Sequence, residues 1–256
     1  MKYVRSFLFI LLLSVFLIQC DKDSGTSPVD NTPQEFVHME YLGHSCFLMT
    51  TSDSLRIVTD PFGSSIQALY DIPDSVVADY ATISHRHADH VNFKGIIGDP
   101  VRLDKADTTY QVGNLTIRGY LSSHGDWGTS KMGSNIIFVY KLNDIKIVHL
   151  GENAMVADST ILNAISDADV MIIPTGQTAS IKFDEIEELK TITHPKTIIP
   201  SHYSTDAENR YYDSSTVEEF VDQLPVGTAV QYGDSLEIMA DMPEQVFCIN
   251  PQYAKE

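Results

Sequence analysis

The chain has 256 residues, of which 43% are hydrophobic, 20% charged and 9% aromatic, a globular composition that excludes collagen-like, low-complexity and wholly disordered chains. Asp and Glu total 35 against 17 Lys and Arg, giving a formal net charge of −18 without a local basic patch, so no nucleic-acid partner is expected. The cysteines Cys20, Cys46 and Cys248 are too few and too scattered for a disulfide framework or a thiolate zinc cluster. We expect Cys46 and Cys248 to be free, and any metal to be held by His and carboxylate side chains.

The N-terminus has the pattern of a targeting segment. A short basic region precedes an apolar run over residues 7–18, which ends abruptly in polar residues and is too short for a permanent membrane span. The run ends in Leu-Ile-Gln-Cys, which resembles the lipobox of bacterial lipoproteins apart from Gln19. We therefore expect residues 1–19 to be a signal peptide and Cys20 to carry a lipid, with an uncleaved anchor or a plain signal peptide as the alternatives. Residues 20–35, rich in Ser, Thr, Pro and Asp, predict a lipid-anchored flexible tether, which implies a membrane partner and a periplasmic or outer-surface location in a bacterial cell envelope.

From residue 36 onward, short β-branched and apolar runs recur in the pattern of strands. In chain order these runs cover residues 36–42, 46–51, 55–61, 80–84, 115–123, 135–142, 145–151, 169–174, 196–203, 229–232 and 235–239. Helix-like stretches lie at 158–167, 184–192 and 214–224, and each begins with an Asp or Ser that can cap it. Strands first, and then strands alternating with helices, predict one layered α/β domain over residues 36–256. We expect the last dozen residues to form a loosely packed tail.

The strongest chemical signal is the string His-Arg-His-Ala-Asp-His at the end of the run over 80–84. In an extended segment alternate side chains share a face, so His85 and His87 can reach one ion, while Asp89 and His90 turn toward a second position. An isolated strand histidine is commonly a packed or solvated residue, but four ligand types in one short string favour a metal site. Imidazole and carboxylate ligands are typical of zinc, with manganese or iron as alternatives.

This string, followed downstream by SSHGD, HLGEN and IPSHY, resembles the metallo-β-lactamase-fold hydrolases. The segments YLGHSCFL, IVTDPF, ADVMIIPTG and YGDSLEI resemble the L-ascorbate-6-phosphate lactonase-like branch of that family. The resemblance implies a four-layered αββα sandwich with two metal ions, expected to be zinc, at one edge of its two sheets. Its implied ligands are His85, His87 and His124 for the first metal, and Asp89, His90 and His202 for the second. Glu152 stands where the family usually has a bridging aspartate, and its longer side chain can bridge, bind one ion or leave the site.

The same set of residues defines an expected chemistry. Two ions bridged by a water would hold it as a hydroxide that attacks the substrate, and catalytic Asp89 would orient the nucleophile or accept its proton. Lesser candidates, each equally compatible with a turn or packing role, are Asp60 as a hydrogen-bond acceptor for a ligand imidazole, His44 and Tyr203 facing the pocket, and Trp127 as a pocket wall. We interpret His38, His149 and His194 as structural.

We therefore expect a metal-dependent hydrolase that uses a metal-activated hydroxide on an ester, lactone or phosphodiester of a small molecule in the cell envelope. Two alternatives stay open: a phospholipase-D-like phosphodiesterase acting on membrane lipid, and a non-catalytic metal-binding lipoprotein, which the glutamate at position 152 motivates. An apolar groove beside the metals would favour the lipid, and a small polar pocket the lactone. A phosphate or carboxylate on the substrate would have to use Arg86 or Lys131, the nearby cations. Hydrolysis of β-lactams is disfavoured, because no residue matches the lactam-binding cysteine or lysine of that family.

Overall fold

The computed structural model describes residues 34–63, 70–71, 75–126, 131–154, 156, 158–206, 208, 210 and 214–255. The chain divides into two compact units, Met1–Gln34 and Glu35–Glu256, and the fold below is that of the second unit. The signal peptide predicted over residues 1–19, the lipid attachment at Cys20 and the tether as far as residue 33 lie outside the described residues. None of the described helices has the length and apolar character needed to cross a membrane.

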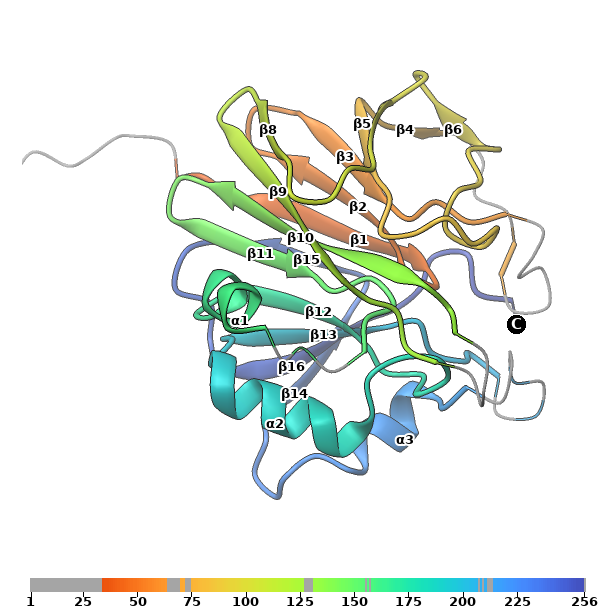
Figure 1. The fold of residues 1–256 in the computed structure, drawn as a ribbon, viewed down its shortest axis with the longest axis vertical. Helices are drawn as coiled ribbons and strands as arrows, with labels where there is room; N and C mark the ends of the chain where they lie inside the picture. The colour runs from red at the N-terminus through yellow and green to blue at the C-terminus, as the bar shows by residue number, and fades with distance from the viewer. Residues whose placement is uncertain are drawn as a thin grey trace, which may run out of the picture. The chain divides into compact units, whose positions relative to one another are not determined.

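Two large β-sheets and one small one form the second unit (Figure 1). The six-stranded sheet has the order β15 (Ser235–Ile238), β1 (Val37–Gly43), β2 (Cys46–Thr51), β3 (Arg56–Thr59), β5 (Tyr80–Thr82) and β7 (Val101–Leu103). The eight-stranded sheet has the order β14 (Val230–Gly233), β16 (Gln245–Ile249), β13 (Thr197–Ser201), β12 (Val170–Pro174), β11 (Ile145–His149), β10 (Ser134–Leu142), β9 (Leu115–Ser123) and β8 (Thr109–Val112). The small sheet pairs β4 (Val76–Val77) with β6 (Ile96–Ile97).

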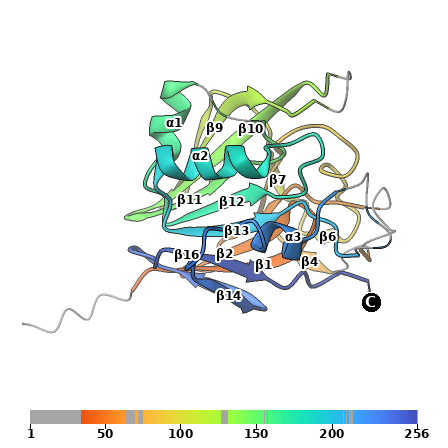
Figure 2. The same cartoon turned by 90° about the horizontal axis from the view of Figure 1, so that it is seen from below.

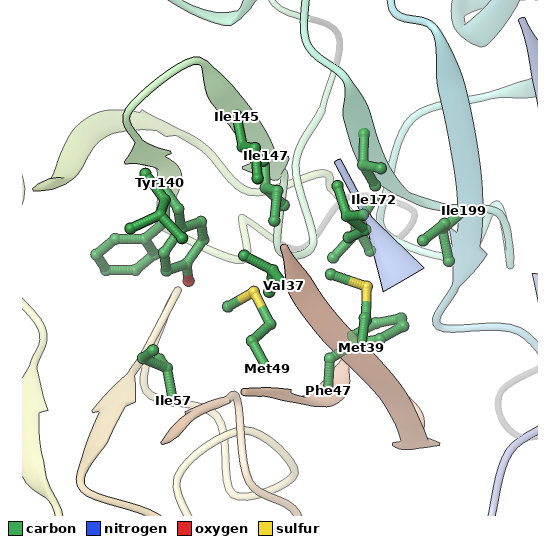
Figure 3. Close-up of a cluster of buried hydrophobic side chains, with 14 of the residues drawn as sticks. Val37, Met39, Phe47, Met49, Ile57, Tyr140, Ile145, Ile147, Ile172 and Ile199 are labelled. Carbon is green, nitrogen blue, oxygen red and sulfur yellow. The ribbon is translucent and has the colours of Figure 1, made fainter. Parts of the chain in front are cut away.

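The main hydrophobic core lies between the two large sheets (Figure 3). Met39 and Met49 are cross-strand partners on β1 and β2, and both side chains are buried. Ile147 and Ile172 bring buried side chains to the same core from neighbouring strands of the eight-stranded sheet. Since successive side chains of a strand point to opposite faces, the alternating burial along β1 follows from its sequence. Each fully buried aliphatic side chain of this kind contributes roughly 1.5–3 kcal/mol to folding.

The outer faces of the two large sheets are covered differently. Helices α1 (Ser159–Ile165), α2 (Phe183–Thr193) and α3 (Val217–Val221) contribute buried side chains to a second core on the eight-stranded sheet (Figure 2). The outer side chains of the six-stranded sheet pack with the β4–β6 pair and with Tyr253 and Ala254, and no described helix joins that cluster. The expected α/β sandwich is therefore confirmed, with its described helices on one side.

The three predicted helices are present, but only one has the predicted cap. Asp158 caps α1, because its carboxylate accepts hydrogen bonds from the backbone N–H groups of the first turn. The caps predicted at residues 184 and 214 are wrong. Helix α2 begins after Lys182, whose N–H donates to the Glu185 carboxylate at 2.8 Å. Helix α3 begins after Thr216, because Thr216 and Glu219 form a reciprocal capping box.

The prediction of a loosely packed C-terminal tail is wrong. Residues Gln245–Ile249 form β16, which lies inside the eight-stranded sheet between β13 and β14 and pairs parallel with both. Val246 and Ile249 are each only 1% exposed. Strands β4, β6, β7, β8 and β16 were not among the predicted runs. Cys46 and Cys248 are buried and free, as expected.

Candidate metal centre

The predicted ligands lie in loops that follow the carboxyl ends of strands. Strand β2 runs antiparallel to β1 and to β3, and β5 is parallel to β3, so β1, β3 and β5 all point the same way. Strands β9, β11 and β13 share a direction in the eight-stranded sheet for the same reason. The loops after these six strands carry, in order, His44, Asp60, residues 85–90, His124, Glu152 and His202. Side chains far apart in sequence thereby meet at one edge of the sandwich.

One cluster contains the three ligands implied for the first metal. His85, His87, His124 and Glu152 each offer a ligand atom, and these atoms lie within 4.8 Å of one another. The Glu152 Oε2 atom is 2.9 Å from His124 Nε2 and 3.4 Å from His85 Nε2. Three of these side chains are buried and His87 is half-buried, so the cluster opens toward solvent on the side of His87.

A second cluster contains the three ligands implied for the second metal and one more. Asp89, His90 and His202 are joined by His44, with ligand atoms again within 4.8 Å of one another. His44 Nε2 lies 3.2 Å from Asp89 Oδ2. The sequence placed His44 only as a candidate facing the pocket, whereas the structure places it among the ligand atoms.

Glu152 contacts histidines of both clusters. Besides His124 and His85, its Oε2 atom lies 3.4 Å from His90 Nε2, and its Oε1 atom lies 3.3 Å from His202 Nε2. Burial alone would raise the pKa of this carboxyl, but attraction by His202 and the hydrogen bond from His124 hold the pKa well below its usual range. Of the three options open from the sequence, this position fits an ionised carboxylate that bridges.

Buried ring nitrogens indicate that the two clusters suit metal ions. In the described part of the chain, the Nε2 atoms of His85, His90 and His202 are buried without a hydrogen-bond partner of good geometry. Burial lowers the pKa of His85 to about 4 and that of His202 to about 3, so both imidazoles are neutral near pH 7. An unsatisfied buried polar atom costs roughly 1–3 kcal/mol, which coordination to a metal ion removes. The residues present therefore fit a divalent cation in each cluster, with nitrogen and oxygen ligands.

Hydrogen bonds to the Nδ1 atoms of three ligand histidines orient their Nε2 atoms toward the clusters. Ser84 Oγ donates to Asp60 Oδ2 at 2.6 Å and therefore accepts from His85 Nδ1 at 2.9 Å. His90 Nδ1 lies 3.1 Å from the same Asp60 oxygen, and His124 Nδ1 lies 2.8 Å from the carbonyl of the next residue. With Nδ1–H used in these bonds, the Nε2 atoms of all three imidazoles face the clusters.

Asp60 thus orients His90 directly and His85 through Ser84, which are ligands of different clusters. Burial would raise its pKa, but the hydrogen bond and charge of His90 lower the pKa to about 2. Burial would lower the pKa of His90, but its hydrogen bond to Asp60 and the nearby carboxylates of Glu152 and Asp89 raise it to about 10. The part played by Ser84 was not predicted, although its place directly before His85 is a signal for it.

Two residues of the second cluster and Asp60 behind it adopt a backbone conformation that only glycine adopts freely. The φ angles of His44, Asp60 and His202 are 57°, 35° and 51°. Each such residue costs on the order of 1–3 kcal/mol and persists only where its surroundings fix it. Here the His202 N–H donates to the His44 carbonyl at 2.6 Å, and the Asp60 N–H donates to the Thr82 carbonyl at 3.0 Å.

A buried asparagine that the sequence analysis missed holds the Glu152 loop. Asn135 Oδ1 accepts from the Glu152 N–H at 3.1 Å, and its Nδ2 donates to the Leu150 carbonyl at 2.8 Å and to Ser122 Oγ at 3.0 Å. Gly151 has a φ of +63°, and a Cβ atom there would lie 2.5 Å from Asn135 Oδ1. An Asn near the start of a predicted strand, where Asn is depleted, is the sequence signal for this role.

The other described candidate, Tyr203, lies away from the clusters. Tyr203 is buried in the core between the sheets, where its ring packs against Tyr41. Of the two roles left open for Tyr203, this placement fits packing and not a side chain that faces the pocket. His149 packs edge-on against Phe47, and His194 ends α2 as a left-handed cap. His38 lies within β1, and Trp127 lies outside the described residues.

Comparisons with known proteins agree on one family and fold. A family model described as "Beta-lactamase superfamily domain" matches residues 38–202. Among curated relatives, a UPF0173 metal-dependent hydrolase of Thermus thermophilus is 25% identical over 233 residues, covering 79% of this chain and 99% of the relative. Another, of Thermococcus onnurineus, is 26% identical over 199 residues, covering 66% of this chain and 85% of the relative. A crystal structure from Thermotoga maritima, described as a Zn-dependent hydrolase of the metallo-β-lactamase superfamily, is 28% identical, covers 83% of this chain and 98% of that one, and gives a TM-score of 0.66.

Proposed function

Because the chain belongs to the beta-lactamase superfamily and is a metal-dependent hydrolase, we propose that it cleaves an ester, lactone or phosphodiester bond of a small molecule in the cell envelope. The observation that carries the proposal is the pair of His and carboxylate clusters with Glu152 in contact with both. A purely structural metal site is closed by its protein ligands, whereas a catalytic site stays open to water and substrate. The half-buried His87 and Asp89 give both clusters such an opening.

The two clusters assign each ligand to a metal position. One divalent ion would be held by His85, His87 and His124, the other by His44, Asp89, His90 and His202, with Glu152 between them. When bound, such ions lower the pKa of a water molecule and polarise the substrate oxygen under attack. The chain itself keeps the ligand imidazoles in one tautomer and excludes water from behind them, because Asp60 and Ser84 are fully buried.

Asp89 is the catalytic side chain of the proposal. Burial would raise its pKa, but the hydrogen bond with His44 and the nearby imidazole charges hold the pKa far below its usual range. A carboxylate that stays ionised suits binding a cation and accepting a hydrogen bond from the nucleophile more than storing a proton. The proton that the leaving group needs then comes from solvent.

The N-terminal pattern supports the envelope location. The segment over residues 1–19 and Cys20 would place the hydrolase on a lipid anchor, where it meets small molecules of the envelope. The resemblance to L-ascorbate-6-phosphate lactonase-like proteins supports a lactone among the substrates. The contacts of Glu152 with both clusters favour a hydrolase over a non-catalytic metal-binding lipoprotein. Incorporation of labelled palmitate into the wild type, but not into Cys20→Ala, would support the anchor, and equal labelling would contradict it.

Metal content measured together with turnover tests the function. We expect two equivalents of metal per chain in the wild type, and hydrolysis of p-nitrophenyl acetate, γ-butyrolactone or bis(p-nitrophenyl) phosphate that a chelator abolishes. Glu152→Asp should retain less metal, because a side chain shorter by one methylene cannot keep its contacts with both His124 and His202. Glu188→Asp, at an exposed position of α2, is the matched control. A wild type that binds no metal, or binds two ions and hydrolyses none of the three probes, would refute the proposal.

A further inference from the structure

A partly open cavity of about 410 Å³ lies directly beside the first cluster. His85 and His87 form part of its wall, so anything in the cavity lies next to two of the proposed metal ligands. The other walls come from β9, β10 and the loop after β7. The Ile136 N–H donates to the Ser84 carbonyl at 2.8 Å, which ties β10 to the loop that carries His85.

One wall of the cavity is apolar and exposed. Leu121 on β9 and Ile136 on β10 are paired across neighbouring antiparallel strands, which places their side chains on one face of the sheet. Leu121 is 51% exposed, and Met132 adds a half-buried side chain to the same wall. An exposed leucine beside metal ligands offers apolar surface that an apolar group of a substrate would remove from water.

The charges of the cavity are balanced. Arg86 is the one Lys or Arg among the described residues that line it, and its guanidinium lies 2.5 Å from the carboxylate of Asp104, the one acidic residue of the lining. Lys131 pairs with Asp126 at 2.7 Å and is not part of the lining. Within the described wall, the one cation is therefore already paired, and a phosphate or carboxylate would have to share the Arg86 guanidinium with Asp104.

We propose that this cavity binds an uncharged apolar group next to the bond that is cleaved, so that the substrate is a neutral ester or lactone bearing one short acyl or alkyl chain. The inference rests on the proposed hydrolase function and narrows it. A volume of about 410 Å³ lies near the lower end of the roughly 300–1,000 Å³ typical of small-molecule sites. It accommodates one short chain and excludes the paired long chains of a membrane lipid.

A chain-length series on the metal-loaded protein tests the proposal. The substrates are p-nitrophenyl acetate, butyrate, hexanoate and octanoate. We expect kcat/KM to rise about fourfold for each added methylene until the cavity is full. Leu121→Asp should flatten this dependence on chain length, because it puts a charge where the chain binds. Leu121→Thr should weaken the same dependence, and threonine is a residue that strands accept readily. Val226→Asp, at a fully exposed apolar position outside the cavity, should keep the dependence of the wild type.

A binding experiment separates this inference from the proposed function. Hexanamide, which carries a short neutral chain, should bind the wild type and Val226→Asp at one saturable site by calorimetry, and bind Leu121→Asp and Leu121→Thr at least tenfold more weakly. If the wild type binds hexanamide but hydrolyses no ester or lactone, the proposed function is overturned, while the cavity remains a site for an apolar group. Three outcomes would overturn the inference and leave a metal-dependent hydrolase. These are hydrolysis whose rate does not depend on chain length, an unchanged chain-length dependence in both Leu121 variants, and a preference for bis(p-nitrophenyl) phosphate.

Discussion

Replacing Asn135 with alanine tests how the chain positions its bridging carboxylate. The amide of Asn135 accepts from the Glu152 N–H and donates to the Leu150 carbonyl, and all three residues are buried. Alanine leaves both backbone groups without these partners. At roughly 1–3 kcal/mol for each unsatisfied buried group, the free energy of unfolding should fall by about 2–6 kcal/mol. With about 2–4 °C of Tm for each kcal/mol in a chain of this size, the metal-free protein should melt at least about 4 °C lower.

The more specific effect is on metal binding. A group that orients a metal ligand typically contributes about 10–100-fold to metal affinity, so we expect a loss of that size in Asn135→Ala, measured by competition with a chelator. Asn135→Asp retains the oxygen that accepts from Glu152 and should recover part of the stability, while its negative charge beside Glu152 keeps metal binding altered. Asn114→Ala, at an exposed position in the turn before β9, is the control. An Asn135→Ala protein that is less stable but binds metal like the wild type would refute the positioning role.

Four further predictions concern the metal-free and the metal-loaded protein. Gly151→Ala should destabilise the metal-free protein by about 1–3 kcal/mol or more, because its Cβ would meet Asn135 and Ser84 at 2.5 Å at a φ of +63°, and unchanged denaturant unfolding would contradict this. His90, with a pKa of about 10 against an ordinary 6.5, should carry a proton at pH 7.5 and lose it on metal binding. Calorimetry in buffers of different ionisation enthalpy should then find about one proton released for the second ion, and no release would count against the hydrogen bonds that raise this pKa. Because that pKa is raised by folding, the stabilisation by His90 in the metal-free protein should be complete below pH 6.5 and be lost as the pH rises toward 10, which unfolding curves at pH 6.5, 8 and 9.5 would show. Finally, chelation should lower the Tm of the loaded protein, since an ion at 1,000 times its Kd adds about 4 kcal/mol to the folded state, and equal melting with and without metal would exclude tight binding.

The part of the site that sequence predicts best is the part that is local. His85, His87, Asp89 and His90 are recognisable together, because spacing within one loop decides which of them share a face. Nothing local connects them to His124, Glu152 or His202. These residues were assigned only through a family resemblance, and the fold brings them together because strands of two different sheets end at one edge.

The features that sequence did not predict depend on packing across the sandwich. His44 enters the second cluster because the turn after β1 adopts a left-handed conformation beside His202. Ser84 orients His85 while its own hydroxyl is held by Asp60, a residue at another strand end. The strand Gln245–Ile249 is short, and its sequence shows little alternation of polar and apolar residues. Only its pairing with β13 and β14, which are distant along the chain, identifies it as part of the sheet.

Both large sheets contribute ligands to each cluster, which couples the metal centre to the fold. In the first cluster, His85 and His87 follow a strand of the six-stranded sheet, while His124 and Glu152 follow strands of the eight-stranded sheet. In the second cluster, His202 comes from the eight-stranded sheet and its companions from the other. Glu152 contacts histidines of both sheets at 2.9–3.4 Å. Glu152 therefore has the contacts with both clusters that the proposed bridging ligand needs.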